Sequence, residues 1–292
     1  MQTNNMDRLI EEYLTDLIAQ GKSEYTRTAY RHHLRRFANW CKENQIDFLS
    51  LTPRQARSFR NWLMEAYPYR PLRGKKRLTP HTVNMIICAV KSFYDYLYEM
   101  ELVKGNPIIS RRLLVPENRS LPRFLREDEL PQIIAAIEKF PPRVQLAFKT
   151  MLASGIRVGE AAALCAEDVV IQNGRVLLHI RRGKRGKERY APVIIPEVAK
   201  ELVQLKSQKQ NGESLFGYRR ATLMEYAERA AKMTGIEFTS HRLRHTLGTW
   251  LLWGGQPLEV VQEVLGHADI STTRIYAQIC PKSFFKLAAR VC

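Results

Sequence analysis

Apolar side chains recur at helical spacing from residue 7 to about residue 105, and this pattern restricts the N-terminal part of the chain to helices. In the clearest stretch, the apolar positions follow the i, i+4, i+7 and i+11 spacing of one helix face: Tyr30, Leu34, Phe37 and Cys41. Two further helices are predicted to begin at Thr52 and Thr79, because each threonine is a good N-cap and precedes a proline that suits the first helical turn. We expect four helices in this region.

A second domain is predicted to follow a short linker. Residues 108–120 combine basic, polar and proline residues without a clear period, which is typical of a linker. The sequence therefore predicts a helical domain over residues 1–107 and a second domain over residues 121–292. In the second domain the strand-like stretches RVLLHIRR and ERYAPVII flank the turn sequence GKRGK, which is a hairpin pattern. The expected fold class is mainly α, with two domains and a small antiparallel β excursion.

The balance of charges indicates a polyanionic partner. The 292 residues carry a formal net charge of +17, and both halves of the chain are positive. Such an excess favours binding to DNA or RNA, although a soluble enzyme that happens to be basic is the alternative. Arg27, Arg31 and Arg35 recur at four-residue spacing on one helix face, where like charges repel unless an anion meets them. They are candidate phosphate contacts, which position DNA without reading its sequence.

The cysteines and the apolar segments point to the cytoplasm. The five cysteines form no CxxC pair, so neither a zinc site nor a disulfide framework is indicated. The first residues do not resemble a secretory signal, and no apolar run approaches the roughly 18 residues that a membrane-spanning helix needs. We expect a cytoplasmic protein without a membrane partner.

Two segments contain arginines suited to phosphate binding. In LASGIRVGEAAAL, Gly155 is expected to end one helix and Arg157 to open the next, either presenting its guanidinium to an anion or pairing with Glu160. In SHRLRHT, the side chains of His241, Arg244 and His245 share one helix face, and Ser240 is the expected N-cap of that helix. This face either binds a phosphate or consists of ordinary polar residues.

Two further chemical groups follow near the C-terminus. A short helix is predicted from Pro257 to Gly266, so that His267 projects from the turn after it, and Tyr276 lies one turn into the next helix. The sequence contains neither clustered carboxylates for two-metal catalysis nor a GxxxxGK[ST] phosphate loop. We therefore expect no metal and no other cofactor.

Taken in order, the segments GIRVGE, GKRGKER, HRLRH, LGH and TTRIY closely resemble the tyrosine recombinase family, over residues 120–280. The resemblance implies a role for each matching residue. Arg157 and Arg244 would hold the scissile phosphate, and His241 and His267 would hydrogen-bond it. Lys184, in the hairpin turn, would protonate the leaving 5′ oxygen, and Tyr276 would attack the phosphorus. Glu160 stands at the family's supporting acidic position, and Lys187 is the alternative to Lys184.

The resemblance also implies an architecture and an assembly. Residues 1–107 would be the SAM-like core-binding domain, and the two domains would form a C-shaped clamp on duplex DNA. Four protomers would exchange strands at two recombination sites, held together by a C-terminal tail helix with the apolar residues FFKLAA. The alternatives are a type IB topoisomerase and a catalytically idle DNA-binding regulator. Phage integration, chromosome dimer resolution and transposon cointegrate resolution all use this architecture, and the short chain, with no extra N-terminal arm-binding domain expected, favours the Xer-like or resolvase-like uses.

Overall fold

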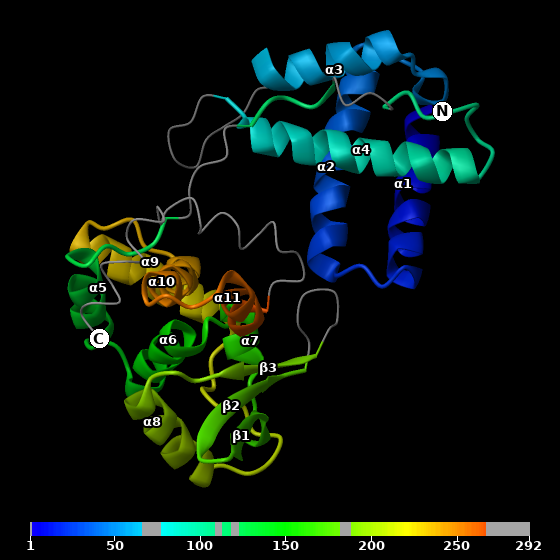
Figure 1. Ribbon diagram of the computed structural model, residues 1–292. Helices are drawn as coiled ribbons and strands as arrows, with labels where there is room; N and C mark the ends of the chain where they lie inside the picture. Colours follow the sequence, from blue (N-terminus) through cyan, green and yellow to red (C-terminus); the bar gives the residue numbers. More distant parts are fainter. Residues whose placement is uncertain (1, 66–76, 109–112, 118–122, 182–187, 267–292) are drawn as a thin grey trace. The chain divides into compact units, whose positions relative to one another are not determined.

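The chain divides into two compact units, Met1–Arg119 (unit one) and Ser120–Cys292 (unit two). The structure is a computed structural model that describes residues 2–65, 77–108, 113–117, 123–181 and 188–266 (Figure 1). Each unit has its own hydrophobic core, so each is described separately.

The four helices predicted for unit one are confirmed. They are α1 (Gln2–Ala19), α2 (Glu24–Glu43), α3 (Pro53–Glu65) and α4 (Pro80–Glu99). The helices start where the capping residues predicted: Thr79 accepts a hydrogen bond from the backbone N–H of Thr82, and the Thr52 hydroxyl accepts one from the backbone N–H of Gln55. Figure 1 shows α4 crossing α1 and α2.

Aromatic side chains fill the core of unit one. Phe37 and Phe59 meet edge to face with ring centroids 5.0 Å apart, a favourable geometry for aromatic pairs. The buried Tyr94 hydroxyl donates to the Phe48 carbonyl at 2.7 Å, so its polar atom is satisfied. Ile108 is also buried in this core, as is Leu113. These two residues of the predicted linker therefore pack as part of unit one.

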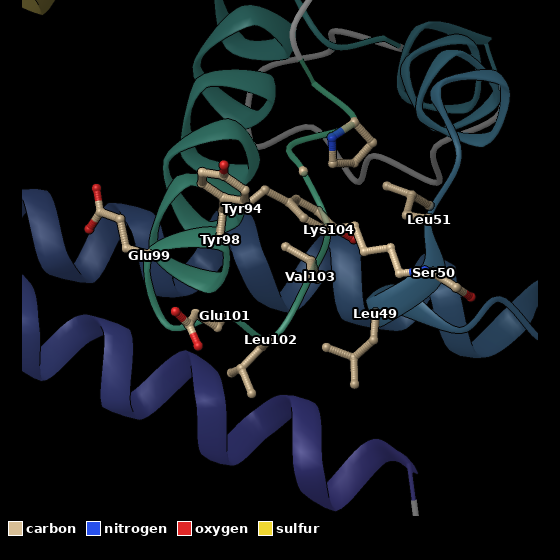
Figure 2. Close-up of a pocket in the computed structure, with 12 residues that line it drawn as sticks. Leu49, Ser50, Leu51, Tyr94, Tyr98, Glu99, Glu101, Leu102, Val103 and Lys104 are labelled. Carbon is tan, nitrogen blue, oxygen red and sulfur yellow. The ribbon is translucent and has the colours of Figure 1, made fainter.

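A pocket of about 920 Å³ opens on unit one beside the short 3₁₀ turn η1 (Phe48–Ser50). Figure 2 shows its walls, which combine apolar side chains such as Leu49 and Val103 with charged ones such as Glu101. Its described lining contains no residue of the predicted site.

Unit two is mainly helical with one small sheet, as predicted. Its helices are α5 (Glu129–Ile137), α6 (Pro142–Ser154), α7 (Val158–Ala163), α8 (Pro196–Ser207), α9 (Arg220–Thr234), α10 (Ser240–Trp253) and α11 (Leu258–Leu265), with a 3₁₀ turn η3 (Ala166–Asp168). Helices α6 and α10 pack together in its interior.

The sheet has three antiparallel strands in the order β1 (Val169–Gln172), β2 (Arg175–Ile180) and β3 (Arg189–Pro192). The β2–β3 hairpin was predicted, and Ile180 pairs with Arg189 where its turn begins. Strand β1 was not predicted. Its turn to β2 consists of Asn173 and Gly174, both at positive φ, the Asn-Gly pair that favours tight hairpins. Among the described residues, no helix is both long and apolar enough to cross a membrane.

Candidate active site

The predicted site is built around a tight corner between α6 and α7. Gly155 ends α6 in the left-handed conformation, with φ +65°. A Cβ at this position would lie 2.7 Å from Leu265 and 3.0 Å from Leu247, so only glycine fits. The corner is thus held against α10 and α11, and this brings segments far apart in the sequence to one place.

Arg157 directly follows this corner as the N-cap residue of α7. Its backbone N–H donates to Glu160 Oε2 at 2.8 Å, and its guanidinium Nη1 donates to Glu160 Oε1 at 2.9 Å. The structure therefore confirms the pairing with Glu160, whereas the binding of an anion by Arg157 stays a prediction. Although Arg157 is paired with Glu160, its side chain is 28% exposed, so its remaining N–H donors are accessible to a ligand.

A second arginine, absent from the predicted site, completes the pairing of Glu160. Arg189, the first residue of β3, donates from Nη1 to Oε1 at 2.9 Å and from Nη2 to Oε2 at 2.8 Å. Burial by itself would raise the pKa of Glu160, but hydrogen bonds from Arg189 and from the Arg157 backbone outweigh it and lower the pKa to about 2. Glu160 is therefore a fixed anion at neutral pH.

Helix α10 contributes the residues of the SHRLRHT segment. Arg244 is 1% exposed, and its Nη1 donates to the carbonyl oxygen of Gly155, which ties it to the corner that precedes Arg157. The expected cap at Ser240 is wrong by one residue: Thr239 is the N-cap, and it makes no side-chain capping bond. The helix start is held by other contacts.

Arg242, between these residues, fixes the start of α10. Its guanidinium donates to Glu129 Oε2 at 2.8 Å and to the Phe124 carbonyl at 2.7 Å. The Thr246 hydroxyl accepts a hydrogen bond from the Leu125 N–H at 2.8 Å. These bonds join the start of unit two to α10, so the first arginine of HRLRH is structural, whereas the second faces the corner.

The two histidines of α10 lie beside these cations. Although His241 is exposed, partial desolvation and the nearby Arg244 and Arg157 cations lower its pKa. His245 packs against His241 with ring centroids 4.7 Å apart, and burial, His241 and the arginines lower the pKa of His245 to about 4. At neutral pH these rings are neutral, able to donate one hydrogen bond and accept another.

The structure thus brings four of the predicted residues to one corner: Arg157, Glu160, His241 and Arg244. The other three predicted residues lie outside the described residues: Lys184, His267 and Tyr276. The same is true of the tail after Tyr276. Gly266, the last described residue, ends α11 with φ +61° directly before His267. In the part of the chain that the structure describes, no group of three His, Cys, Asp or Glu side chains is arranged to hold a metal ion.

The arginines predicted on α2 are not equivalent. Arg31 donates to both carboxylate oxygens of Glu11 on α1, at 2.9 and 2.7 Å. The anion that meets Arg31 is therefore a residue of a neighbouring helix, while Arg35 is exposed and Arg27 half-buried.

Sequence reasoning missed Arg189 and the role of Arg242; the only signal for Arg189 is its place directly after the hairpin turn, in GKRGKER.

Comparison with known proteins agrees with this organisation. The profile of the phage integrase family matches residues 123–282, and that of the phage integrase N-terminal SAM-like domain matches residues 10–101. Tyrosine recombinase XerA of Pyrococcus horikoshii is 30% identical to this chain, covering 94% of it and 90% of its own length.

Solved structures share the fold of both units. XerH site-specific recombinase bound to palindromic difH substrate, in a post-cleavage complex, has a TM-score of 0.70 at 20% identity and covers 98% of this chain and 84% of its own. A lambda integrase tetramer bound to a Holliday junction has a TM-score of 0.68 at 18% identity, with coverages of 91% and 78%. Because the catalytic profile alone spans more than half of the sequence, this chain belongs to the phage integrase family of tyrosine recombinases.

Proposed function

We propose that the chain is a site-specific DNA recombinase that cuts and rejoins duplex DNA through a 3′-phosphotyrosyl intermediate. The observation that carries the proposal is the convergence of Arg157, Arg244 and His241 at the Gly155 corner. Two arginines and a neutral imidazole suit a phosphodiester, and the net charge of +17 suits DNA. Family membership supports the same chemistry.

In this mechanism the phenol oxygen of Tyr276 attacks the scissile phosphorus, and the bond from phosphorus to the 5′ oxygen breaks. The phenol proton passes to a neutral histidine or to solvent, and Lys184 gives a proton to the departing 5′ oxygen. Arg157 and Arg244 neutralise the charge that grows on the non-bridging oxygens. The reverse reaction, with a 5′ hydroxyl from the partner DNA, rejoins the strands, so the phosphotyrosyl bond conserves the energy of the phosphodiester.

The geometry of the corner suits this division of labour. Glu160 holds one edge of the Arg157 guanidinium, so that little side-chain freedom is lost when the remaining donors meet a phosphate. Arg244 is buried and bound to a backbone carbonyl, which also fixes its orientation. A preorganised pair of cations stabilises a transition state better than mobile surface cations do.

We further propose the assembly that this reaction needs. Strand exchange between two duplexes requires four cleavages, so four copies of the chain would act together, each closing its two units around DNA as a C-shaped clamp. The tetrameric arrangement of a lambda integrase on a Holliday junction supports this. The tail after Tyr276 would join neighbouring protomers, and the reaction would take place in the cytoplasm.

The test is a covalent-trapping assay with a nicked DNA substrate, which loses its short cleaved strand and cannot be rejoined. In excess EDTA and without ATP, the wild-type chain should become linked to the substrate through Tyr276. Tyr276→Phe should bind the same DNA and form no adduct, whereas Tyr190→Phe, a matched control on β3, should still form it. An adduct on the Tyr276→Phe variant would reject the assigned nucleophile.

The same preparation separates the rival functions. Relaxation of supercoiled plasmid at any sequence, without exchange of strands between sites, would indicate topoisomerase action. DNA binding with no adduct from the wild-type chain would indicate a regulator. Site-dependent products in which flanking DNA has been exchanged support recombination.

A further inference from the structure

The side chain of Arg189 lies at the centre of unit two's candidate site without belonging to the set of residues assigned to the chemistry. It is the first residue of β3, directly after the hairpin turn that contains Lys184. Its side chain is 17% exposed, and its guanidinium makes two parallel hydrogen bonds with Glu160, which is itself only 7% exposed. A buried, bidentate arginine–carboxylate pair holds its two partners in a defined orientation.

The Nε and Cδ atoms of Arg189 lie beside Gly266, the residue before His267 in the sequence. Helix α11 packs against β3, and Gly266 ends α11 in the left-handed conformation. A Cβ added at Gly266 would lie 2.5 Å from Arg189 Cδ and closer still to its buried Nε. The backbone at Gly266 can approach the arginine this closely only because the residue has no side chain.

Arg189 therefore contacts three parts of the site at once. Through Glu160 it reaches Arg157, because the same carboxylate binds the Arg157 backbone and guanidinium. Through its own backbone it pairs with Ile180, the last residue of β2. Through its aliphatic carbons and Nε it supports Gly266, one residue before His267.

We propose that Arg189 is a positioning residue, which aligns Arg157 and the Gly266 turn for attack on the scissile phosphate. The inference rests on the proposed function, since it assigns Arg189 to the cleavage step. Arg189 acts through its neighbours: its two Nη atoms are bound to Glu160, and its Nε faces Gly266. A displacement of about 1 Å in a catalytic group can slow a reaction roughly 10²-fold, so loss of this support should be large in rate.

The experiment measures the single-turnover cleavage rate on the nicked substrate, with enzyme in saturating excess, beside DNA affinity over a range of salt concentrations. Arg189→Gln should lower the rate roughly 10²-fold, with DNA affinity and its salt dependence nearly unchanged. Arg189→Lys should recover part of the rate, since it restores the charge opposite Glu160 but not the second hydrogen bond. Arg181→Gln is the matched control: this arginine directly follows β2, is 48% exposed and pairs with Glu167 and Asp168. It should cleave at the wild-type rate.

A second pair of variants keeps the inference testable if Arg189→Gln does not fold. Gly266→Ala should slow cleavage by pushing the new methyl group against Arg189, and Gly235→Ala should not. Gly235 ends α9 at φ +69° but has open space where a Cβ would lie, so it carries the same backbone strain without the contact. When Arg189 has already been replaced by alanine, adding Gly266→Ala should slow cleavage little further, because the new methyl group then has room.

Three results would overturn the inference. The first is wild-type cleavage at saturation by Arg189→Gln. The second is weaker binding with a shallower salt dependence and normal cleavage, which would make Arg189 a phosphate contact. The third is equal slowing by the two glycine variants. Absence of any adduct from the wild-type chain would reject the proposed function instead, so the two failures are distinguishable.

Discussion

The two units bury different kinds of side chain. Among the described residues, the buried polar and charged residues all lie in unit two: Thr150, Ser154, Glu160, Asp168, Arg242, Arg244, Thr246 and Thr249. The core of unit one is apolar and aromatic, and its buried tyrosine hydroxyls bond locally, as Tyr13 does with Ser92 at 2.7 Å.

This difference separates stability from function. Burying aromatic rings removes apolar surface from water and stabilises the fold without further requirements. Burying Glu160 or Arg244 removes a charge from water, which is costly unless partners compensate. Unit two keeps these charges at the Gly155 corner, where the proposed role of Arg244 is to bind a phosphate and that of Glu160 is to hold Arg157. The buried side chains of unit one thus serve packing, whereas several of those of unit two are proposed to serve the reaction.

The largest loss of stability is expected from Phe59→Ala in unit one. Phe59 is fully buried between Phe37 and Trp40, with ring centroids 5.0 and 5.1 Å away. Truncation should lower the free energy of unfolding by about 3–5 kcal/mol, measured by urea denaturation. Tyr98→Ala, at a position 56% exposed, is the control and should change it little. A small loss at Phe59 would show that the aromatic core does not carry the stability of unit one.

Arg244→Met should show the opposite behaviour in unit two. Cleavage at saturation should fall roughly 10²–10³-fold, because one preorganised donor to the phosphate is removed. Stability should change by only about 1 kcal/mol, since methionine fills similar space and the variant gives up the hydrogen bond to Gly155. A loss as large as that of Phe59→Ala, in the same urea titration, would make Arg244 a structural residue and remove the contrast between the units.

The same contrast explains what could be predicted from the sequence. The helices of unit one follow from apolar spacing and threonine caps, and every one is confirmed because local signals and packing agree. In unit two, the spacing of GIRVGE and HRLRH located Arg157 and Arg244, but not their contacts. Arg189 was missed because its partner, Glu160, lies 29 residues away and no short-range pattern links a strand residue to a helix cap.

The errors are also local in origin. Strand β1 was overlooked because four residues are too few to show alternation, although Asn173 and Gly174 mark its turn. Ser240 was expected to cap α10, but Arg242 instead holds the start of that helix, by a hydrogen bond to the carbonyl of Phe124, far away in the sequence. Tertiary contacts replaced the local cap, which sequence spacing alone does not reveal.

Glu160→Gln should reveal the buried ion pairs through pH. The pKa of Glu160 is lowered from an ordinary value of 4.5 to about 2. A carboxylate with a lowered pKa stabilises the folded state above its unfolded pKa, and this stabilisation disappears as the pH falls from 4.5 to about 2. Its size is on the order of 3 kcal/mol. The difference in unfolding free energy between wild type and variant should therefore be large at neutral pH and should shrink across this range; a difference independent of pH would show that the charge is not responsible.

The smallest effects are expected on the surface of unit one, where the charges of α2 remain in water. Arg31 is engaged by Glu11, and an exposed pair of this kind contributes about 0–1 kcal/mol, so Arg31→Gln should hardly alter stability. Arg35 is exposed to solvent, and its contact with DNA is a prediction. Removing one arginine that binds a phosphate should reduce the slope of log affinity against log salt by about 0.9. Arg35→Gln should show that reduction, and Arg31→Gln should show a smaller one, because the Arg31 guanidinium must leave Glu11 before it can meet a phosphate.

Glu11→Gln tests this reason. If the pairing restrains Arg31, DNA binding at low salt should strengthen in Glu11→Gln and weaken again when Arg31→Gln is added. Equal slopes for the two arginine variants would mean that DNA displaces the pair freely, and the ion pair would then have no bearing on how unit one meets its partner.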